Sequence, residues 1–433
     1  MDTEKTMEKI VSLAKRRGFV YQGSEIYGGL AGTWDYGPLG VALKNNIKQL
    51  WWKRFVDDRE DMYGFDAAIL MNQNVWKASG HVDGFADPLV ECTKCQKRFR
   101  ADHLDDKTNC PDCGGVLGAE KSFNMMFQTN VGAMQDEISV SYLRPETAQG
   151  MFVNFKNVID SFHPKLPFGL AQIGKAFRNE IAPRDFVFRT REFEQMEIEY
   201  FVKPADWQKA FEELRTEVLA FNAEIGLAAD HVHELEVEAE DRAHYSERTI
   251  DFEFDFPFGR KELYGLAYRT DYDLKKHSDS STVDLSYYDE ESKERFIPHV
   301  IEPSFGVDRT VLAVLSDAYR EDEMNGETRS YLALAPSVAP VLVAVFPLLK
   351  NKPELIVKAR TLFAELKAKF GRVAFDDNGN IGKRYRRQDE IGTPYCVTVD
   401  FDTLEDETVT IRHRDSGEQE RVTIADLLTK LNS

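Results

Sequence analysis

The sequence predicts an α+β protein, with a large domain built on an antiparallel β-sheet and a smaller C-terminal α/β domain. The 433 residues exceed what one hydrophobic core normally serves, so two or more domains are expected. Short connections join consecutive strand-like runs in the middle of the chain, which favours antiparallel pairing. Strand and helix patterns alternate after Pro340, which indicates a separate α/β unit. The strand-like runs of the first sheet are residues 170–177, 192–201, 249–256, 262–267 and 300–305.

Amphipathic patterns predict helices over residues 4–18, 42–57 and 206–227. The second of these follows Gly37-Pro38-Leu39-Gly40, which is predicted as an entry turn, and has Lys and Arg near its end, as the helix dipole favours. We assign residues 1–334 to the large domain and residues 335–433 to the C-terminal domain. Two insertions are expected in the large domain, one at about 86–135 that carries four cysteines and a helical one at about 203–245.

The C-terminal domain has a regular pattern of its own. Buried strands are expected at 341–346, at 373–375 and around Val397, and a helix at 353–370 begins with a proline and ends before Gly371. A basic segment, residues 381–392, precedes the strand around Val397. Residues 415–418 are predicted to join the last two strands as a hairpin.

Charge and patterning exclude several classes of protein. The formal net charge of -19 disfavours nonspecific binding to nucleic acid or to an anionic membrane, so a nucleic-acid partner requires a local basic patch. The N-terminus lacks the basic and apolar regions of a secretory signal. The longest apolar stretch, residues 331–349, contains three prolines and is predicted as a linker that runs into a buried strand rather than a membrane span. We therefore expect a soluble, cytoplasmic protein.

Four of the five cysteines form two knuckles, Cys92-x-x-Cys95 and Cys110-x-x-Cys113, with fourteen residues between them. Four thiolates at this spacing can converge on one tetrahedral ion, and zinc is the expected occupant. Four protein ligands leave no open position for water, so such a site is structural. The alternative is a pair of disulfides or a redox dithiol, which a cytoplasmic location disfavours. Cys396 lies in an apolar strand-like run and is expected in the core.

An ordered set of charged and aromatic residues indicates an ATP site. Arg178-Asn179-Glu180 comes at a strand end, Phe193 begins the next strand, and Gly306-Val307-Asp308-Arg309 comes much later, before a helical run. A carboxylate can hold an adenine edge, an aromatic ring its face, and two arginines the phosphates, which they meet bidentately. Glycine allows close approach of the backbone, and a helix N-terminus supports an anion.

Alternation along two strands brings carboxylates together. A period of two places Phe193, Gln195, Glu197 and Glu199 on one face, and Glu302 with Ser304 on one face of the later strand. Carboxylates that converge in a cleft bind a cationic group well, because an ammonium relieves their mutual repulsion. We interpret Glu197 and Glu302 as part of such a cleft and expect Glu199 to be exposed to water.

Several motifs carry a resemblance to a known family. The order of GPLG at 37–40, FRNE at 177–180, FEQME at 193–197 and EPSFGVDR at 302–309 resembles the three motifs of class II aminoacyl-tRNA synthetases. RPETAQG at 144–150, FRTREF at 188–193 and EPSFG at 302–306 are similar to the homodimeric glycyl-tRNA synthetases within that class. The resemblance spans essentially the whole chain. It implies a class II antiparallel catalytic domain with a zinc-knuckle insertion and a C-terminal anticodon-binding domain.

The resemblance also implies roles for individual residues. Arg178 and Arg309 would be the catalytic residues on the phosphates, Glu180 would bind the adenine edge, Phe193 the adenine face, and Glu262 would lie near Mg²⁺. The implied ATP site comprises Arg178, Asn179, Glu180, Phe188, Arg189, Thr190, Arg191, Glu192, Phe193, Glu262, Leu263, Gly306, Val307, Asp308 and Arg309. The implied glycine site comprises Arg100, Glu146, Phe193, Glu194, Gln195, Met196, Glu197, Glu302, Pro303, Ser304, Phe305 and Gly306.

The implied reaction needs no side-chain nucleophile. ATP with Mg²⁺ would activate glycine as an adenylate, and a terminal ribose hydroxyl of tRNA(Gly) would then take the glycyl group. The acceptor end would approach Arg184, and the anticodon would meet the basic segment with Lys383, Arg384, Arg386 and Arg387, where Tyr385 adds an aromatic for stacking. The family implies a homodimer, with the helix after Gly40 at the interface.

Three other interpretations account for parts of the sequence. A synthetase-like binding protein without activation chemistry would lack the phosphate arginines or the adenine contacts, and these are present. A synthetase for threonine, serine or proline would need a larger or zinc-bound side-chain pocket, whereas Ser304 between Glu302 and Gly306 favours glycine. A plain zinc-ribbon nucleic-acid module accounts for the cysteines alone.

Overall fold

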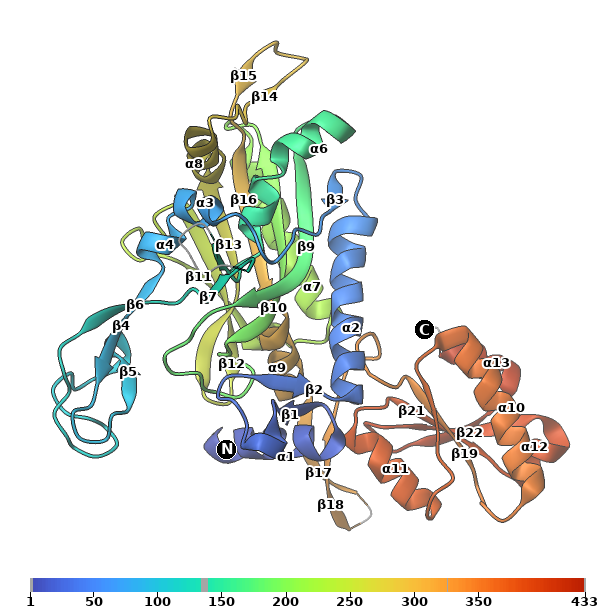
Figure 1. Cartoon of the computed structure of the whole chain (residues 1–433). Coiled ribbons are helices and arrows are strands. Elements are labelled where there is room, and N and C mark those ends of the chain that lie inside the picture. Colours follow the sequence, from blue (N-terminus) through green and yellow to red (C-terminus); the bar gives the residue numbers. More distant parts are fainter. Residues whose placement is uncertain (1–2, 134–138, 325, 432–433) are drawn as a thin grey trace.

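The computed structural model describes residues 3–133, 139–324 and 326–431, and an antiparallel sheet forms its centre (Figure 1). Seven strands stand in the order β11-β12-β13-β16-β10-β9-β3, and β3 is the one strand of this sheet that pairs in parallel, with β9. The strands are β3 Met62–Gly64, β9 Phe168–Phe177, β10 Glu192–Val202, β11 Val232–Glu236, β12 Arg248–Phe256, β13 Gly259–Thr270 and β16 His299–Gly306. All five predicted strands of this sheet are confirmed.

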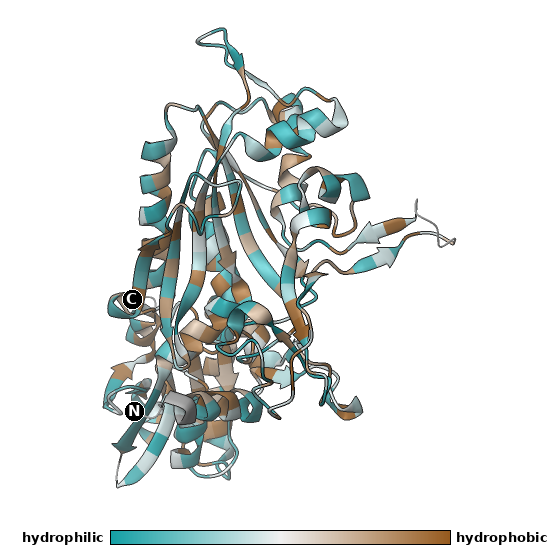
Figure 2. Cartoon of the chain, turned by 90° about the vertical axis from the view of Figure 1, so that its left-hand side faces the viewer, coloured by the Kyte–Doolittle hydropathy of each residue, from teal (hydrophilic) through white to brown (hydrophobic). Residues whose placement is uncertain are grey.

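Alternation decides which face of the sheet each side chain occupies. Met196 and Ile198 of β10 and Phe305 of β16 lie fully buried in the main hydrophobic core, on the helix-covered face. In the register between β10 and β16, Met196 stands opposite Phe305 and Glu197 opposite Ser304. The polar partners therefore project from the other face. Figure 2 shows the apolar colour gathered in the sheet and the helices against it, and mostly hydrophilic colour on the projecting hairpins.

Three helices cover the core face of the sheet: α2 Pro38–Trp52, α7 Trp207–Glu224 and α9 Val307–Ala318. The helix predicted from residue 42 begins at Pro38 instead, and its last turn widens into a π-helix over Lys53–Asp57. Proline suits the first helical position because it has no N–H to leave unpaired. Gly40 lies inside this helix. Only glycine fits at this position, because a β-carbon there would stand 1.9 Å from the carbonyl oxygen of Phe19.

The N-terminal elements and the small helices surround this core. They are α1 Thr3–Arg17, β1 Val20–Gln22, β2 Trp34–Tyr36, α3 Gln73–Ala78, α4 His81–Gly84, α5 Ala148–Phe152, α6 Phe155–Phe162, α8 Tyr272–Ser281, β14 Tyr287–Tyr288 and β15 Arg295–Phe296. The hairpin of β17 Tyr319–Met324 and β18 Glu327–Leu332 leads from α9 towards the C-terminal domain.

The two expected insertions differ in how far they leave the core. Strands β4 Ala86–Glu91, β5 Arg98–Arg100 and β6 Lys121–Asn124 form a separate three-stranded sheet that projects from the body (Figure 1). A hairpin of β7 Gln128–Asn130 and β8 Val140–Tyr142 returns the chain, and part of the expected boundary near 135 falls outside the described residues. The segment 203–245 does not project from the large domain, because α7 packs in the main core and β11 is an edge strand of the main sheet.

The C-terminal domain is a five-stranded mixed sheet in the order β20-β19-β21-β22-β23, with its own core. Its elements are β19 Val343–Pro347, α10 Pro353–Phe370, β20 Val373–Phe375, α11 Ile381–Glu390, β21 Tyr395–Val399, α12 Phe401–Asp406, β22 Thr408–His413, β23 Gln419–Thr423 and α13 Ile424–Lys430. Helix α10 and strands β20 and β21 lie as predicted, and the hairpin at 415–418 joins β22 to β23. Cys396 is buried, as expected.

The basic segment forms α11, and two of its side chains point inward. Arg384 is 1% exposed and donates hydrogen bonds to the backbone carbonyls of Pro347, Asp377 and Gly379. Tyr385 donates or accepts a hydrogen bond with Thr398 at 2.7 Å and packs against Phe346. The predictions that Arg384 contacts tRNA and that Tyr385 offers a stacking surface are therefore corrected, because both side chains fix α11 to its own sheet.

Among the helices of the described ranges, none combines the length and the apolar character that a membrane crossing requires.

Candidate active site

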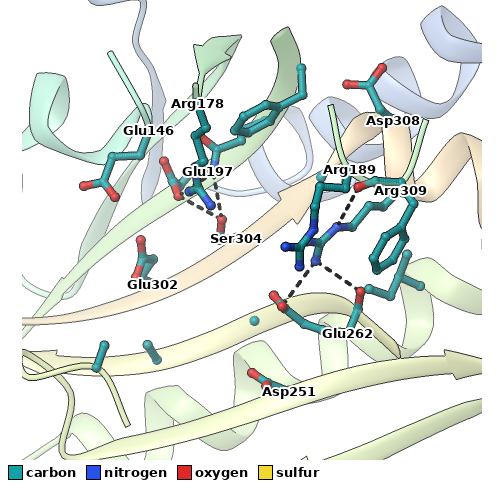
Figure 3. A pocket seen from close by; sticks show the side chains of 18 of the residues that line it. Glu146, Arg178, Arg189, Glu197, Asp251, Glu262, Glu302, Ser304, Asp308 and Arg309 are labelled. Carbon is teal, nitrogen blue, oxygen red and sulfur yellow. Dashed lines mark hydrogen bonds and ion pairs between the residues drawn. The ribbon is translucent and has the colours of Figure 1, made fainter. Parts of the chain in front are cut away.

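A cavity of about 360 Å³ opens on the polar face of the main sheet, between β10, β13 and β16. Figure 3 shows its two ends. Glu146, Glu197, Glu302 and Ser304 gather at one end, and Arg189, Glu262 and Arg309 lie at the other. The cavity therefore offers a negative compartment for a cation next to a compartment with arginines for an anion.

Glu197 is held rigidly in the carboxylate end. Its Oε2 accepts hydrogen bonds from the backbone N–H of Thr147 at 3.0 Å and from the hydroxyl of Thr147. Its Oε1 accepts from Ser304 Oγ at 2.8 Å and from Gln195 Nε2 at 3.4 Å. Four donors from three segments of the chain orient this carboxylate, which is 2% exposed. Burial, and then the charge of Glu146, raise its pKa.

Glu302 shares a buried arginine with Asp273. Arg269, in β13, donates from NH1 to Glu302 Oε2 at 2.7 Å, and from Nε and NH2 to the two carboxylate oxygens of Asp273 at 2.8 and 2.9 Å. Arg269 is 1% exposed, and its guanidinium also stacks on the ring of Tyr245 at 3.7 Å. Burial raises the pKa of Glu302, and the guanidinium of Arg269, which binds its carboxylate, opposes the shift. One guanidinium thus partly balances several acidic groups.

Glu146 closes the carboxylate end from the segment before α5. His81 Nε2 lies 3.4 Å from Glu146 Oε2, and Gln149 Nε2 donates to Oε1 at 3.0 Å. Burial opposes ionisation, but His81, and then Arg269, lower the pKa of Glu146 below its ordinary value. His81 and Arg269 therefore favour the anionic form of Glu146.

The other end presents arginines around aromatic rings. Arg309, at the start of α9, lies 3.2 Å from Glu262 Oε2 and 4.5 Å over the ring of Phe188. Arg178 lies 5.2 Å over the ring of Phe193 and donates to the carbonyl of Pro145 at 3.1 Å. An arginine over an aromatic face keeps its planar donors free to meet phosphate oxygens.

Two carboxylates stand beside these arginines. Arg309 lowers the pKa of Glu262, whose side chain is half exposed, more than desolvation in the cavity raises it. Asp251, in β12, lines the same end of the cavity, and burial together with Glu262 raises its pKa to about 7. Oxygen ligands of this kind suit a hard divalent cation that bridges phosphates.

The four knuckle cysteines converge in the projecting insertion. The Sγ atoms of Cys92 and Cys113 lie 3.6 Å apart, those of Cys95 and Cys110 lie 3.7 Å apart, and none of these cysteines forms a disulfide. All four sulfur atoms lie within 4.8 Å of one another. Thiolates at the corners of a tetrahedron about 2.3 Å from a zinc ion would stand about 3.8 Å apart. The donor set thus fits one tetrahedral metal ion, and no disulfide joins these four cysteines in the structure.

Comparisons with known proteins agree with this geometry. Residues 128–318 match the tRNA synthetase class II core domain (G, H, P, S and T), and residues 342–433 match an anticodon binding domain. The chain is 52% identical to a glycine–tRNA ligase of Clostridium acetobutylicum over 99% of this chain and 98% of the relative. A glycine–tRNA ligase of Treponema denticola is 49% identical over 100% of this chain and 98% of its own. The chain belongs to the glycine–tRNA ligase family.

A solved structure supports the fold of this glycine–tRNA ligase family member. Prolyl-tRNA synthetase of Giardia lamblia, in complex with prolyl-adenylate, aligns with a TM-score of 0.73 over 99% of this chain and 75% of that chain. The sequence identity is 15%, so the likeness concerns the class II architecture alone.

The structure brings most of the residues predicted for the ligase site into one cavity. The predicted residues that line it are Glu146, Arg178, Glu180, Phe188, Arg189, Thr190, Phe193, Glu194, Gln195, Glu197, Glu262, Leu263, Glu302, Ser304, Gly306, Asp308 and Arg309. Asp308 and Glu194 also have structural partners. Asp308 accepts hydrogen bonds from Tyr36, from Lys44 and from the backbone N–H of Glu194, whose side chain pairs with Lys44 and Lys48.

Other predicted residues do not line the cavity. Met196, Phe305 and Val307 belong to the core, where the alternation of the strands and the start of α9 direct them, and Pro303 is buried beside them. Arg191 donates to the carbonyls of Ala31 and Glu180 and so shapes the loop. Asn179 is also outside the lining, and Glu192 pairs with Lys175 on the surface. Arg100 pairs with Asp87 and Asp102 in the insertion. The assignments of the four buried residues are corrected, whereas those of Arg191, Asn179, Glu192 and Arg100 stay predictions.

Two further corrections concern side chains at the carboxylate end. Glu199 was expected in water, but it is 0% exposed, because its strand is buried on both faces at that point. Arg269 was missed, together with its partners Asp273 and Tyr245. An arginine within the apolar run of 263–269 was the available signal, because a charge in a central strand requires a buried partner.

Proposed function

We propose that this chain activates glycine with ATP and transfers the glycyl group to tRNA, using the cavity between β10, β13 and β16. The observation that carries the proposal is the juxtaposition of a carboxylate compartment with an arginine compartment in one cavity of about 360 Å³. A glycine needs a place for its ammonium and little room for a side chain. ATP needs donors for its phosphates and an aromatic face for its base.

The ammonium of glycine is assigned to the carboxylates of Glu146, Glu197 and Glu302. Thr147, Ser304 and Arg269 orient these carboxylates before the substrate arrives, so little reorganisation is needed on binding. Burial and, after it, mutual repulsion raise the pKa values of Glu197 and Glu302, and a cation relieves the repulsion. The pocket only has to exclude residues larger than glycine, which steric contact can do, whereas excluding a smaller amino acid yields about 10 to 200-fold discrimination.

ATP is assigned to the arginine compartment. Phe193 faces the adenine ring, Glu180 its edge, Arg178 the α-phosphate and Arg309 the far phosphate. A carboxylate oxygen of glycine attacks the α-phosphorus in line, the bond to the bridging oxygen breaks, and pyrophosphate leaves. Arg178 and Arg309 stabilise the charge that develops on the phosphoryl oxygens, so positioning and electrostatics carry the catalysis. A ribose hydroxyl of tRNA then attacks the glycyl carbonyl, and AMP leaves.

Two metal ions complete the proposal. Glu262 and Asp251 would hold Mg²⁺, which would neutralise phosphate charge when it is bound with ATP. Cys92, Cys95, Cys110 and Cys113 would hold a structural zinc ion. The acceptor end of tRNA is assigned to the loop with Arg184, which is 3.4 Å from His103 of the insertion. The anticodon is assigned to the C-terminal domain, where Lys383, Arg386 and Arg387 remain candidates on α11.

We further propose that the chain works as a homodimer. Ile26 and Tyr27 are 89% and 87% exposed, and Leu30 is 56% exposed, in the connection between β1 and β2. A contiguous apolar loop of this kind is costly in water and is typical of a surface that a partner covers. Sedimentation at several concentrations tests this, and Ile26→Glu with Tyr27→Glu should shift the equilibrium towards monomers.

The test of the function is glycine-dependent exchange of pyrophosphate into ATP without tRNA. Glycine, alanine, serine, threonine and proline are compared, with Arg178→Ala as the matched control. We expect exchange with glycine alone and a loss of roughly 100-fold in the control, the typical effect of removing one transition-state donor. Exchange with another amino acid would overturn the specificity, and the absence of exchange with all five would favour a binding protein.

A further inference from the structure

Glu199 is a carboxyl group in an unusual position beneath the proposed glycine pocket. It lies on β10 two residues after Glu197 and therefore on the same face, and the register of β10 with β16 sets it opposite Glu302. One carboxylate oxygen from each of Glu197, Glu199 and Glu302 lies within 4.8 Å of the other two. Glu199 does not line the cavity, so it supports the pocket from below.

The surroundings of Glu199 offer it no donor. It is 0% exposed, and both of its oxygens lack a hydrogen-bond partner among the described residues. Leu170 of β9 stands opposite it, and Phe201 and Leu274 continue the apolar cluster on that side. The charged groups that act on the carboxyl are Glu197 and Glu302 of the pocket, Arg269 on β13 and Asp273 on α8.

A buried carboxylate anion without any donor is one of the most unfavourable arrangements in a protein. Arg269 relieves it only by its charge and donates no hydrogen bond to it, because its guanidinium donates to Glu302 and to Asp273. Two carboxyl groups can form a hydrogen bond with each other only through a proton that one of them carries. Protonation therefore removes a charge from Glu199 and gives it a donor where its nearest polar neighbours are acceptors.

We propose that Glu199 stays a neutral carboxylic acid and positions Glu302 for glycine by donating its O–H to that carboxylate. Glu302 is the suitable acceptor, since both oxygens of Glu197 already accept bonds from Thr147, Ser304 and Gln195. Arg269 occupies Oε2 of Glu302, so a second donor would fix the orientation of the group completely. This inference rests on the proposed function, and burial and Glu302 also raise the pKa of Glu199.

Two substitutions of similar size should have different effects if Glu199 acts as a neutral donor. Glu199→Gln keeps a neutral side chain with an N–H donor, and Glu199→Met keeps the length without a donor. We expect the KM for glycine in pyrophosphate exchange to change less than about 3-fold in E199Q and to rise more than about 10-fold in E199M, with kcat changed less than about 3-fold in both. Glu197→Gln, which removes a charge that faces the ammonium, should raise the glycine KM strongly.

A second measurement tests protonation without any substrate. The infrared C=O absorption of buried carboxylic acids at pH 8 should lose the contribution of one group in E199Q and stay unchanged in Glu418→Gln at an exposed position. An equal absorption in E199Q and the unmodified chain would overturn the proposal. Dependence of the melting temperature on added Mg²⁺ or K⁺ that E199Q abolishes would also overturn it, in favour of a bound cation.

The two measurements also distinguish this proposal from the proposed function. If the chain exchanges no pyrophosphate with glycine, the function fails and the positioning role falls with it, whatever the infrared result. If exchange is normal and E199Q is as damaged as E199M, the function stands and the neutral Glu199 is wrong.

Discussion

Asp251 shows how position alone can set the pH response of a single residue. Burial and the neighbouring Glu262 and Glu253 raise its pKa to about 7, from an ordinary value of 3.8. At a pH between these two values, Asp251 is protonated in the folded chain and ionised in the unfolded chain. The stability that Asp251 contributes is present at low pH and is lost as the pH rises from about 4 to about 7.

Replacing Asp251 with Asn should therefore remove the loss of folding stability that ionisation of this carboxyl causes at higher pH. We expect the difference in unfolding free energy, Asp251→Asn minus the unmodified chain, to grow between pH 5 and pH 8, as measured from urea midpoints. Asp279→Asn, at an exposed position on α8, should give a difference that does not change with pH. An equal difference at both pH values for Asp251→Asn would show that Asp251 stays ionised throughout.

The location of a single residue was predicted better where it belongs to a motif than where it depends on a buried partner. Glu197, Glu302 and Ser304 were identified from strand alternation, and they meet in the cavity. Glu199 and Arg384 were misjudged because a charged residue is normally solvated, and burial depends on elements far away in the chain. Arg269 was missed because its partners, Glu302 and Asp273, are recognised only once β13, β16 and α8 are in place.

At the scale of elements, the projecting insertion depends on its cysteines rather than on a large core. Its buried cluster contains Val90, Ala101 and Leu117 around Cys92 and Cys110. So small an apolar group cannot offset the entropy of ordering the segment, which is why a metal is expected to supply the folding free energy. The spacing of the knuckles was sufficient to predict this element, whereas the three-stranded sheet around it was not predicted.

Substitution of Cys110 by Ser should release the metal and unfold the insertion locally. Metal analysis should find about one zinc ion per chain in the unmodified protein and much less in Cys110→Ser. Hydrogen exchange should then accelerate in residues 86–124 and stay slow in β10 and β16. Cys396→Ser, at a buried cysteine of the C-terminal domain, is the control for zinc content. Full zinc content in Cys110→Ser would show that the knuckles do not hold the ion.

Element boundaries were predicted well where a residue type fixes them and less well elsewhere. Pro353 and Gly371 bound α10 as expected, because proline suits the first turn and glycine the position after the last. The start of α2 was placed four residues late, since Gly40 in a helix is disfavoured until the close approach of Phe19 is known. The role of α7 in the main core likewise depends on tertiary packing.

At the scale of the whole molecule, a buried ionic cluster links the two domains. Asp389 of α11 is 2% exposed and accepts from Arg329 NH1 of β18 at 3.0 Å and from Arg412 of β22 at 2.7 and 2.9 Å. Arg329 also pairs with Asp322 of β17. Because the cluster spans both domains, it fixes the C-terminal domain against the hairpin that leaves α9, and thereby relative to the cavity.

Removal of the Asp389 carboxylate should make the two domains unfold independently and leave the cavity intact. Asp389→Ala leaves Arg329 and Arg412 without their shared buried anion, and breaking a buried pair in this way costs about 3 to 5 kcal/mol. We expect calorimetry to resolve two transitions where the unmodified chain has one. Glycine-dependent pyrophosphate exchange should persist, and aminoacylation of tRNA should fall, because only the second step needs the two domains in register.

The same interface contains a matched control. Glu327 of β18 pairs with Arg386 of α11 at 3.2 Å, but Glu327 is 80% exposed, so Glu327→Ala should cost less than about 1 kcal/mol and change neither reaction. If Asp389→Ala reduced exchange and aminoacylation equally, the cluster would stabilise the catalytic domain itself rather than its alignment with the C-terminal domain. A single calorimetric transition at lower temperature would lead to the same conclusion, because the domains would then unfold together without the ionic link.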